Sequence, residues 1–515
     1  MALLVQSLLS NPGIPLQDRQ EALDRALSDP GLPTPNPTSS FWLRSPHPDL
    51  AKIQSPELPA EADVVIIGSG VTGTSIARTL LESRKPRNNG PGQERTSRPA
   101  IVMLEARDIC SGATGRNGGH ILETAEEFAD LEEAHGTDAA RKILRFRLAH
   151  LREFFAVAEE YGLTETAQAR KVQFLSVYFN QKAWSEARRR FLHGEWRLYE
   201  REDIPKEFSL PHAQGIVAGP AGAIWPYRFI TGVLGHLKTE YHDDLKIETN
   251  TPVTNIEDDR RKAPNGLRYT LTTPRGTIRA SHVVHCTNAH VAHLVPGLKG
   301  RICPVRGQMS AQHPGTKFRS QGAEHSWLFN YDRGFDYLTQ LPPSPSDAGE
   351  MMMFGGGFSQ GEGGAISDLG VSTDSELSLY ADIHLSGALS AVFGRENWGA
   401  VPLRAVEQMW TGNMGFSADG FPWVGRLPAS LTRRGQDAQG ERGAEWVSAA
   451  FSGEGMVLAW LCGKALGTML LCQDNDLLDG EAVDLSWFPE QMLVTDERAK
   501  KAVYALSVSN VSPHL

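Results

Sequence analysis

The sequence predicts an α/β fold built around a buried parallel sheet, and two apolar segments predict it. Residues 64–67 (Val-Val-Ile-Ile) form a short apolar run of the kind found in strands that are covered on both faces. A glycine-rich turn and an apolar segment with helical spacing follow it, and a second apolar run, residues 101–104, comes next. This alternation of strand, helix and strand is typical of parallel sheets.

Length and composition indicate two or more domains in a reducing compartment. A chain of 515 residues exceeds what one ordinary core accommodates. The formal charge of −10 disfavours nucleic acid as a partner. The five cysteines are scattered and include no CxxC pair, so we expect no disulfide framework. No apolar run approaches the roughly 20 residues of a membrane helix, so we expect no membrane partner.

Residues 1–60 are expected to form a lead-in arm. Prolines concentrated in residues 11–60 cannot donate hydrogen bonds to a helix or a sheet, so we expect an extended chain there. The first ten residues are apolar but lack a basic segment and a cleavage site, and we interpret them as a helix or arm rather than a targeting signal. The aromatic patch at 41–43 (Phe-Trp-Leu) is expected to dock on the body of the protein, whose regular structure begins at Asp63.

Three polar stretches and one amphipathic stretch complete the outline. Residues 85–99, 342–350 and 433–442 are expected to be surface loops. Residues 122–161 carry apolar side chains at helical spacing and predict long helices, with the apolar face made by Leu144, Leu148, Leu151, Phe155 and Ala158.

The glycine turn after the first strand has the spacing GxGxxG. Gly68 permits a tight turn, Gly70 lets the backbone approach a pyrophosphate, and Gly73 lets the helix pack close to the strand. Val71 and Thr72 open the helix, whose N-terminal amides and dipole favour an anion. The second strand ends in Glu105, where a carboxylate can accept hydrogen bonds from ribose hydroxyls. The motif therefore predicts a dinucleotide site, although alone it does not separate FAD from NAD.

A long loop of glycines and small polar residues, 110–120, follows Glu105 and favours FAD. Such a loop can place many backbone amides against a large, flat, anionic cofactor. Its cofactor-binding candidates, together with the two residues after Glu105, are Ala106, Arg107, Ser111, Ala113, Thr114, Arg116, Asn117, Gly118 and Gly119.

Five later segments resemble one family of enzymes. They are residues 251–256, 283–289, 304–308, 410–425 and 451–456. Together with the glycine turn they resemble the D-amino-acid oxidase superfamily over roughly residues 61–475. Its amine-oxidising branch includes glycine oxidase, sarcosine oxidase and gamma-glutamylputrescine oxidase. The resemblance adds the cofactor-binding candidates Val253, Thr287, Asn288, Gly425, Gly453, Glu454, Gly455 and Met456, and a helix over 457–471 that directs its positive end at the flavin.

The resemblance implies a Rossmann-type FAD-binding domain, glutathione-reductase-like, interleaved with an antiparallel-sheet α+β substrate domain. After the arm at 1–60, the FAD-binding domain is expected at 61–165, 223–300 and 404–480. The substrate domain is expected at 166–222 and 301–403. Residues 481–515 are expected to be a C-terminal extension.

The sequence departs from the family pattern at three places. Gln408 and Met409 stand where monomeric sarcosine oxidase attaches FAD through a cysteine. Arg116 stands where dimethylglycine dehydrogenase has a histidine, although His120 is close. Both departures predict FAD that is bound non-covalently. Glu454 stands where many members have histidine, which changes the local charge beside the flavin.

Four residues are candidates for catalysis: Arg306, Tyr337, Trp410 and His120. Arg306 could bind a substrate carboxylate bidentately or hold the loop or the flavin. Tyr337 lies with Phe335 where the family lines its substrate cavity, as do residues 225–228, and Trp410 could wall the cavity. Core packing is the alternative for each aromatic residue.

A group of histidines and one cysteine raises the question of a zinc site. His282, His285, Cys286, His290 and His293 are residue types that bind zinc. A strand would point His282 and His285 to opposite faces, so we expect no metal site.

The resemblance implies oxidation of the C–N bond of a small amine or amino acid by hydride transfer to flavin N5. The imine product is hydrolysed and the flavin is reoxidised by O₂ or another acceptor. Three alternatives stay open: a dehydrogenase or cyclising enzyme acting on a larger biosynthetic intermediate, a non-catalytic FAD-binding protein, and an NAD-linked dehydrogenase. The oligomeric state is not indicated.

The C-terminal tripeptide Pro513-His514-Leu515 partly resembles a peroxisomal address. Proline replaces the usual serine, so a cytoplasmic location is the alternative.

Overall fold

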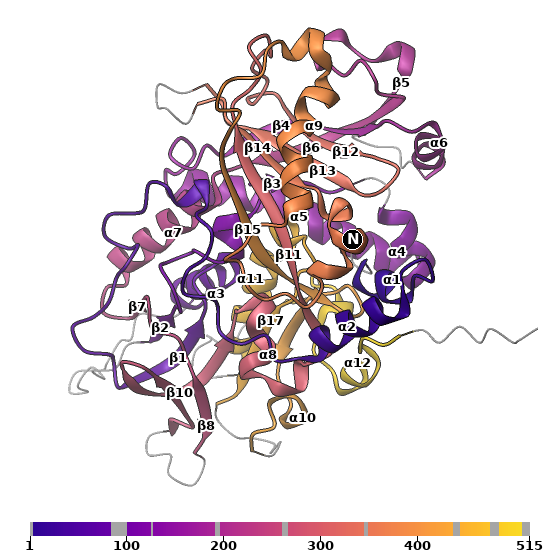
Figure 1. The fold of residues 1–515 in the computed structure, drawn as a ribbon. Coiled ribbons are helices and arrows are strands. Elements are labelled where there is room, and N and C mark those ends of the chain that lie inside the picture. The colour runs from indigo at the N-terminus through magenta and orange to yellow at the C-terminus, as the bar shows by residue number, and fades with distance from the viewer. Residues whose placement is uncertain are drawn as a thin grey trace, which may run out of the picture.

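Two β-sheets dominate the computed structural model, one in the lower and one in the upper part of Figure 1. The structure describes residues 4–83, 100–124, 127–190, 196–259, 266–343, 349–435, 443–473 and 484–506. The expected loop at 85–99 and the C-terminal tripeptide lie outside these residues, as do 344–348 and 436–442 of the other two expected loops.

The first sheet is largely parallel and has the order β16-β17-β10-β1-β2-β7. β1 pairs in parallel with β2 on one side and with β10 on the other. Both predicted strands are confirmed. The bounds are β1 Glu61–Ile67, β2 Ile101–Leu104, β7 Leu245–Glu248, β8 Asn255–Asp258, β9 Tyr269–Thr273, β10 Gly276–His285, β16 Trp423–Arg426 and β17 Glu445–Ala449.

Helices α3 (Val71–Glu82) and α11 (Ala459–Gln473) pack against each other beside this sheet. A Cβ on Gly73 would lie 2.1 Å from the carbonyl oxygen of Gly68, so only glycine allows this close contact between α3 and the turn. The helix expected over 457–471 is present as α11, which begins after a short 3₁₀ turn at Gly455–Val457.

The second sheet has the order β15-β11-β14-β13-β12-β4-β6-β3, with β5 paired to β6. Its pairs are antiparallel except β12 with β4. The bounds are β3 His120–Ile121, β4 Arg170–Tyr178, β5 Arg197–Glu200, β6 Gly215–Ala223, β11 Ile302–Gln312, β12 His325–Asn330, β13 Phe335–Gln340, β14 Met352–Gly356 and β15 Val406–Ser417. The chain passes repeatedly between the two sheets, which confirms the predicted interleaved α/β architecture.

The long helices expected between residues 122 and 161 are α4 (Glu127–His135) and α5 (Thr137–Glu160). The buried face of α5 is rotated by about one position from the predicted one: Ile143, Phe146 and Phe154 are buried, whereas Leu144 and Leu148 are only half-buried. The remaining helices are α6 Gln181–Arg189, α7 Pro226–Glu240, α8 Val291–Leu294, α9 Leu379–Trp398, α10 Ala429–Thr432 and α12 Asp496–Lys501.

The prediction of an extended N-terminal arm was wrong in part. α1 (Leu4–Ser10) agrees with the helix expected in the first ten residues, but α2 (Leu16–Leu27) lies where an extended chain was expected; both are drawn in indigo at the right of Figure 1. No proline occurs between Pro15 and Pro30, so the chain is free to form α2 there. The arm is otherwise largely irregular as far as β1.

The aromatic patch of the arm docks as predicted. Phe41 and Trp42 are buried, and Trp42 lies edge-on to Trp225 with 5.1 Å between ring centroids. In the segment 251–256, strand β8 begins at Asn255, and residues 251–254 precede it in irregular backbone.

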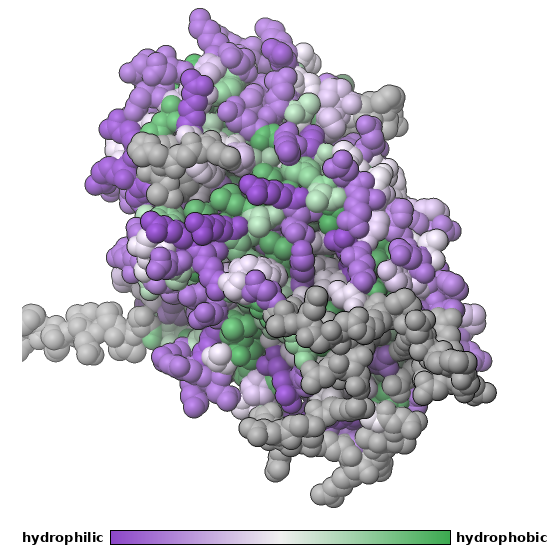
Figure 2. All heavy atoms as spheres, turned by 180° about the vertical axis from the view of Figure 1, so that it is seen from behind, coloured by the Kyte–Doolittle hydropathy of each residue, from purple (hydrophilic) through white to green (hydrophobic). Residues whose placement is uncertain are grey.

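Figure 2 shows the opposite side of the molecule. Apolar side chains gather near the middle of that face, and hydrophilic side chains dominate its upper end. Among the described residues, no helix combines the length and the apolar character needed to cross a membrane.

Candidate active site

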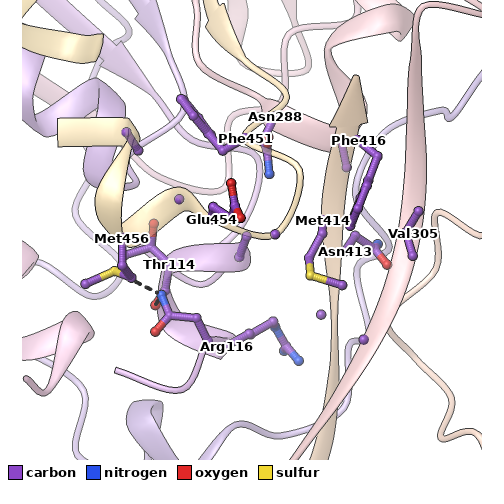
Figure 3. A pocket seen from close by; sticks show the side chains of 18 of the residues that line it. Thr114, Arg116, Asn288, Val305, Asn413, Met414, Phe416, Phe451, Glu454 and Met456 are labelled. Atoms are coloured by element: carbon purple, nitrogen blue, oxygen red, sulfur yellow. Dashed lines mark hydrogen bonds between the residues drawn. The ribbon is translucent and has the colours of Figure 1, made fainter. Parts of the chain in front are cut away.

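A cavity of about 740 Å³ lies between the two sheets. One wall comes from the carboxyl ends of β1, β2 and β10, and from the segment 451–456, here called the closing loop. The other wall comes from the second sheet. Figure 3 shows this arrangement, with Glu454 and Met456 on the closing loop and with Asn413, Met414 and Phe416 on β15.

The glycine turn fits a pyrophosphate. A Cβ on Gly70 would stand 2.8 Å from Oγ1 of Thr114, so a side chain there would collide with the residue that closes the turn. The amide of Val71 donates a hydrogen bond of 3.1 Å to the same oxygen. Gly68 has a φ of +112°, a conformation that favours glycine. The bare turn opens directly onto the cavity at the N-terminus of α3, where an anion is favoured.

Glu105 is held at the edge of the cavity by three donors. One carboxylate oxygen accepts from the amide and the hydroxyl of Ser69, at 3.1 and 2.7 Å, and the other accepts from the amide of Arg107 at 3.1 Å. Val253 lines the cavity on the same side as the strand ends. A carboxylate fixed in this way can accept hydrogen bonds from a ribose.

The glycine loop, residues 110–120, is hydrogen-bonded both to the closing loop and to the N-terminal arm. Asn117 donates from Nδ2 to the sulfur of Met456 at 3.5 Å, which ties it to the closing loop. From the arm, the hydroxyl of Ser40 donates a hydrogen bond of 2.6 Å to the carbonyl of Gly115. The indole N–H of Trp42 donates to the backbone carbonyl of Asn117. The loop thus depends on a segment that precedes the first sheet.

Two arginines of the glycine loop region share one buried carboxylate. Arg107 and Arg116 lie 3.0 and 3.3 Å from the carboxylate of Asp374, which also lines the cavity. Burial lowers the pKa of Arg116 to about 10, still far above neutral pH. Sequence reasoning missed Asp374, since it lies 267 residues from Arg107 in an ordinary polar stretch.

The wall formed by the second sheet is largely neutral. His120 shares a hydrogen bond of 2.8 Å between Nε2 and the hydroxyl of Ser326. Burial, with a smaller effect of Arg170, lowers the pKa of His120 to about 3, so the ring is uncharged at neutral pH. Burial likewise raises the pKa of the Tyr337 hydroxyl, which keeps it protonated. Other residues on this wall are Ser176, Tyr178, Met309, Leu328, Asn330 and Phe335.

A charged cluster closes one side of the cavity. The guanidinium of Arg147, on α5, forms ion pairs with Glu123, with Glu127 at 2.9 Å and with Glu454 at 2.8 Å. We call these four residues the Arg147 cluster. Only Glu454 was a predicted site residue.

Some predicted residues do not line the cavity. Arg306 pairs with Asp368 at 2.7 Å, because side chains alternate along β11 and its neighbours Val305 and Gly307 take the cavity face. Of the two roles considered for Arg306, this pair fits the one in which it holds a loop rather than a substrate carboxylate. Trp410 is fully buried and donates its indole N–H to the carbonyl of Arg116, so it belongs to the core.

The other corrections concern glycines and neighbouring residues. Among predicted cofactor residues, those that do not line the cavity are Gly73, Ser111, Gly119 and Gly425. Gly73 and Gly119 instead permit close backbone contacts behind it. Trp225 and Tyr227 are core residues, whose polar atoms bond to Trp42 and His47 of the arm.

The remaining predicted cofactor residues all line the cavity. They are Gly68, Gly70, Val71, Thr72, Glu105, Ala106, Arg107, Ala113, Thr114, Arg116, Asn117, Gly118, Val253, Thr287, Asn288, Gly453, Glu454, Gly455 and Met456. Thr287 Oγ1 is buried without a partner among the described residues, as expected of an atom that serves a ligand. The bare glycine turn and this orphaned hydroxyl fit FAD.

The histidines near β10 have separate partners. His285 pairs with Glu445 at 2.9 Å, and His293 pairs with Asp29 of the arm at 2.9 Å. His282 accepts a hydrogen bond from the amide of Ala444. In the part of the chain that the structure describes, no group of three potential ligands could hold a metal ion.

Comparison with known proteins agrees with this geometry. A family model described as FAD dependent oxidoreductase matches residues 63–469. The probable oxidoreductase OrdL of Haemophilus influenzae is 21% identical over 430 residues, which cover 81% of this chain and 84% of that protein. The gamma-glutamylputrescine oxidoreductase of Escherichia coli K12 is 32% identical over 107 residues, covering 21% of this chain and 22% of that protein.

The match thus spans about a quarter of the length of some curated relatives. Among solved structures, glycine oxidase from Geobacillus kaustophilus superposes with a TM-score of 0.55 at 17% identity. The superposition covers 85% of this chain and 99% of that one, which shows a shared fold.

Proposed function

Because this chain belongs to the family of FAD-dependent oxidoreductases, we propose that it oxidises the C–N bond of a small amine or amino acid. FAD, when bound, accepts the hydride of the substrate at flavin N5. The proposal includes hydrolysis of the imine product by water and reoxidation by O₂.

The charge of the cavity wall is the observation that carries this proposal. Among the arginines that line the cavity, Arg107 and Arg116 pair with the buried Asp374, Arg147 pairs with the glutamates of its cluster, and Arg190 pairs with the exposed Asp130. This wall offers a substrate phosphate no unpaired guanidinium among these arginines, whereas an uncharged amine needs none. It therefore supports an amine substrate over a glycerophosphate, the other substrate type among the family's relatives.

The neutral wall of the second sheet supports the proposal further. Oxidation by hydride loss requires the amine to be uncharged, and the uncharged His120 and Tyr337 avoid repelling or trapping a charge there. Met309, Leu328 and Phe335 exclude water from the reacting carbon. We propose that Tyr337 and His120, which line the cavity, orient the substrate, and that Arg306 and Trp410, which do not line it, have structural roles.

A substrate screen tests the proposal. Purified holoenzyme is mixed with primary amines, secondary amines, and L- and D-amino acids, and peroxide release is measured alongside anaerobic bleaching of the flavin absorbance. We expect bleaching with at least one amine class and peroxide on admission of air. Bleaching only by hydroxy acids or glycerophosphate would contradict the proposal, and bleaching without peroxide would restrict it to a dehydrogenase.

A further inference from the structure

Arg147 binds three carboxylates that come from three separate segments. Glu123 follows β3, Glu127 begins α4, and Glu454 belongs to the closing loop. The arginine side chain is 8% exposed and those of Glu123 and Glu454 are 1% and 11% exposed. The cluster is therefore assembled by the tertiary fold inside the protein, where charges are screened little.

The Arg147 cluster faces the cavity. Arg147, Glu127 and Glu454 line it, together with the glycines on either side of Glu454. The next residue of the closing loop, Met456, contacts Asn117, and Gly118 meets the ring of Tyr337. Glu105 and Val253 belong to another part of the lining, which comes from the end of β2 and from the segment before β8. Since the glycine turn takes the diphosphate and Glu105 takes the adenosine side, the flavin ring belongs at the end with Glu454.

Three carboxylates share a single positive charge in the cluster. Burial raises the pKa of Glu127 well above its usual value and also raises that of Glu123. For Glu454, burial alone would raise the pKa, but the charge of Arg147 acts together with hydrogen bonds to Arg147 and Glu127, and the pKa lies below its usual value. Arg147 pairs with Glu454 at 2.8 Å and favours its ionised form, so a carboxylate charge lies on the cavity wall.

We propose that Glu454, positioned by Arg147, lowers the reduction potential of the bound FAD. Two-electron reduction adds negative charge to the flavin ring, and charge near the ring is one means by which a protein tunes a flavin. A fixed carboxylate on the same wall disfavours that added charge in a poorly screened site. The inference rests on FAD binding and is independent of the substrate.

The test is the midpoint potential of the bound flavin, measured at pH 7 by equilibration with reference dyes in the holoenzyme. Glu454→Gln should raise the potential by an amount equal to about a tenfold shift in the reduction equilibrium, or about 30 mV. Glu454→His should raise it as well. A purely structural role for Glu454 would alter thermal stability without this shift in potential.

Glu153→Gln is the matched control. Glu153 also lies on α5 and pairs with Lys464 at 3.1 Å, but it is partly exposed and does not line the cavity, so its loss should leave the potential unchanged. A potential in Glu454→Gln equal to that of the unmodified enzyme, or to that of Glu153→Gln, overturns the proposal. Loss of flavin from both Glu454 variants with the fold intact also overturns it, because Glu454 would then fix the loop rather than tune the cofactor.

Discussion

The indole N–H of Trp42 donates a hydrogen bond of 2.5 Å to the backbone carbonyl of Asn117, across 75 residues of chain. Asn117 in turn reaches Met456 on the closing loop. The N-terminal arm therefore supports the cofactor wall from behind.

Trp42→Phe should weaken FAD binding. The change keeps an aromatic ring at this position but removes the donor to Asn117. The hydrogen bond that is lost stabilises the loop conformation by about 1 kcal/mol. We expect the dissociation constant for FAD to rise about fivefold, measured by fluorescence titration of apoprotein. Trp184→Phe is the control, since Trp184 is equally buried and its acceptor, Glu200, neither lines the cavity nor belongs to the glycine loop. Equal FAD affinity in both variants would contradict a role of the arm at the cofactor.

Gly70→Val should abolish FAD binding while most of the fold is retained. The new side chain would meet Thr114 and fill the turn that receives the diphosphate. Flavin content per polypeptide is read from the absorbance ratio after purification, and circular dichroism checks the fold. Gly387→Val, on α9 with open space around it, should keep full occupancy. Normal occupancy in Gly70→Val would place the phosphates elsewhere.

FAD should leave the protein on acid precipitation. Gln408 and Met409 stand where a covalent cysteine link would be, and the described cysteines nearest the cavity, Cys110 and Cys286, have their pKa values raised by burial, which suppresses the reactive thiolate. We expect a yellow supernatant and a colourless pellet. Flavin retained in the pellet would indicate a covalent link, with His120 the first residue to examine.

Stability should fall as the pH drops from about 6.5 towards 4, in part through His150. This buried ring lies between α5 and α11: Nδ1 is bonded to the carbonyl of Phe146, and Nε2 accepts from the amide of Leu461. Burial lowers its folded-state pKa to about 4. Between the unfolded pKa of about 6.5 and the folded pKa, His150 is protonated in the unfolded chain but neutral in the folded one. The free energy of unfolding therefore falls by up to about 1.4 kcal/mol per pH unit.

The thermal midpoint measured against pH tests this effect. His150→Gln should make the decline between pH 6.5 and 4 shallower, although His120 and His290, whose pKa values are also lowered by burial, keep part of it. His242→Gln, at a side chain that is 73% exposed, should leave the profile unchanged. A profile of equal slope in His150→Gln would contradict the assignment.

The sequence predicts the cofactor half of the site well because that half is local. The glycine turn, Glu105 and the closing loop are each contiguous, and the spacing of their residues carries the chemistry. The interleaved fold follows from the same motifs. The arm's α2 was missed because the prolines on either side of it dominate the composition.

The other half of the site depends on side-chain direction and on distant partners. Arg306 and Trp410 lie in segments that resemble the family and that form β11 and β15, but neither side chain lines the cavity, and a motif does not show which face of a strand a residue takes. The carboxylates that neutralise the cavity arginines are far away in sequence: Asp374 lies 267 residues from Arg107, and Glu454 lies 307 residues from Arg147. Such pairs become visible only when the chain is folded.

The strand order of the first sheet has a consequence for how the chain is made. β1 is complete by residue 67, yet its neighbour β10 begins only at Gly276, and β17, on the far side of β10, begins at Glu445. During synthesis the edge of β1 that later pairs with β10 is therefore unpaired while the first strands of the second sheet are made. Open edges of this kind invite pairing with other chains. The yield of folded enzyme should accordingly depend on chaperones and on slow translation more than on the stability of the finished protein.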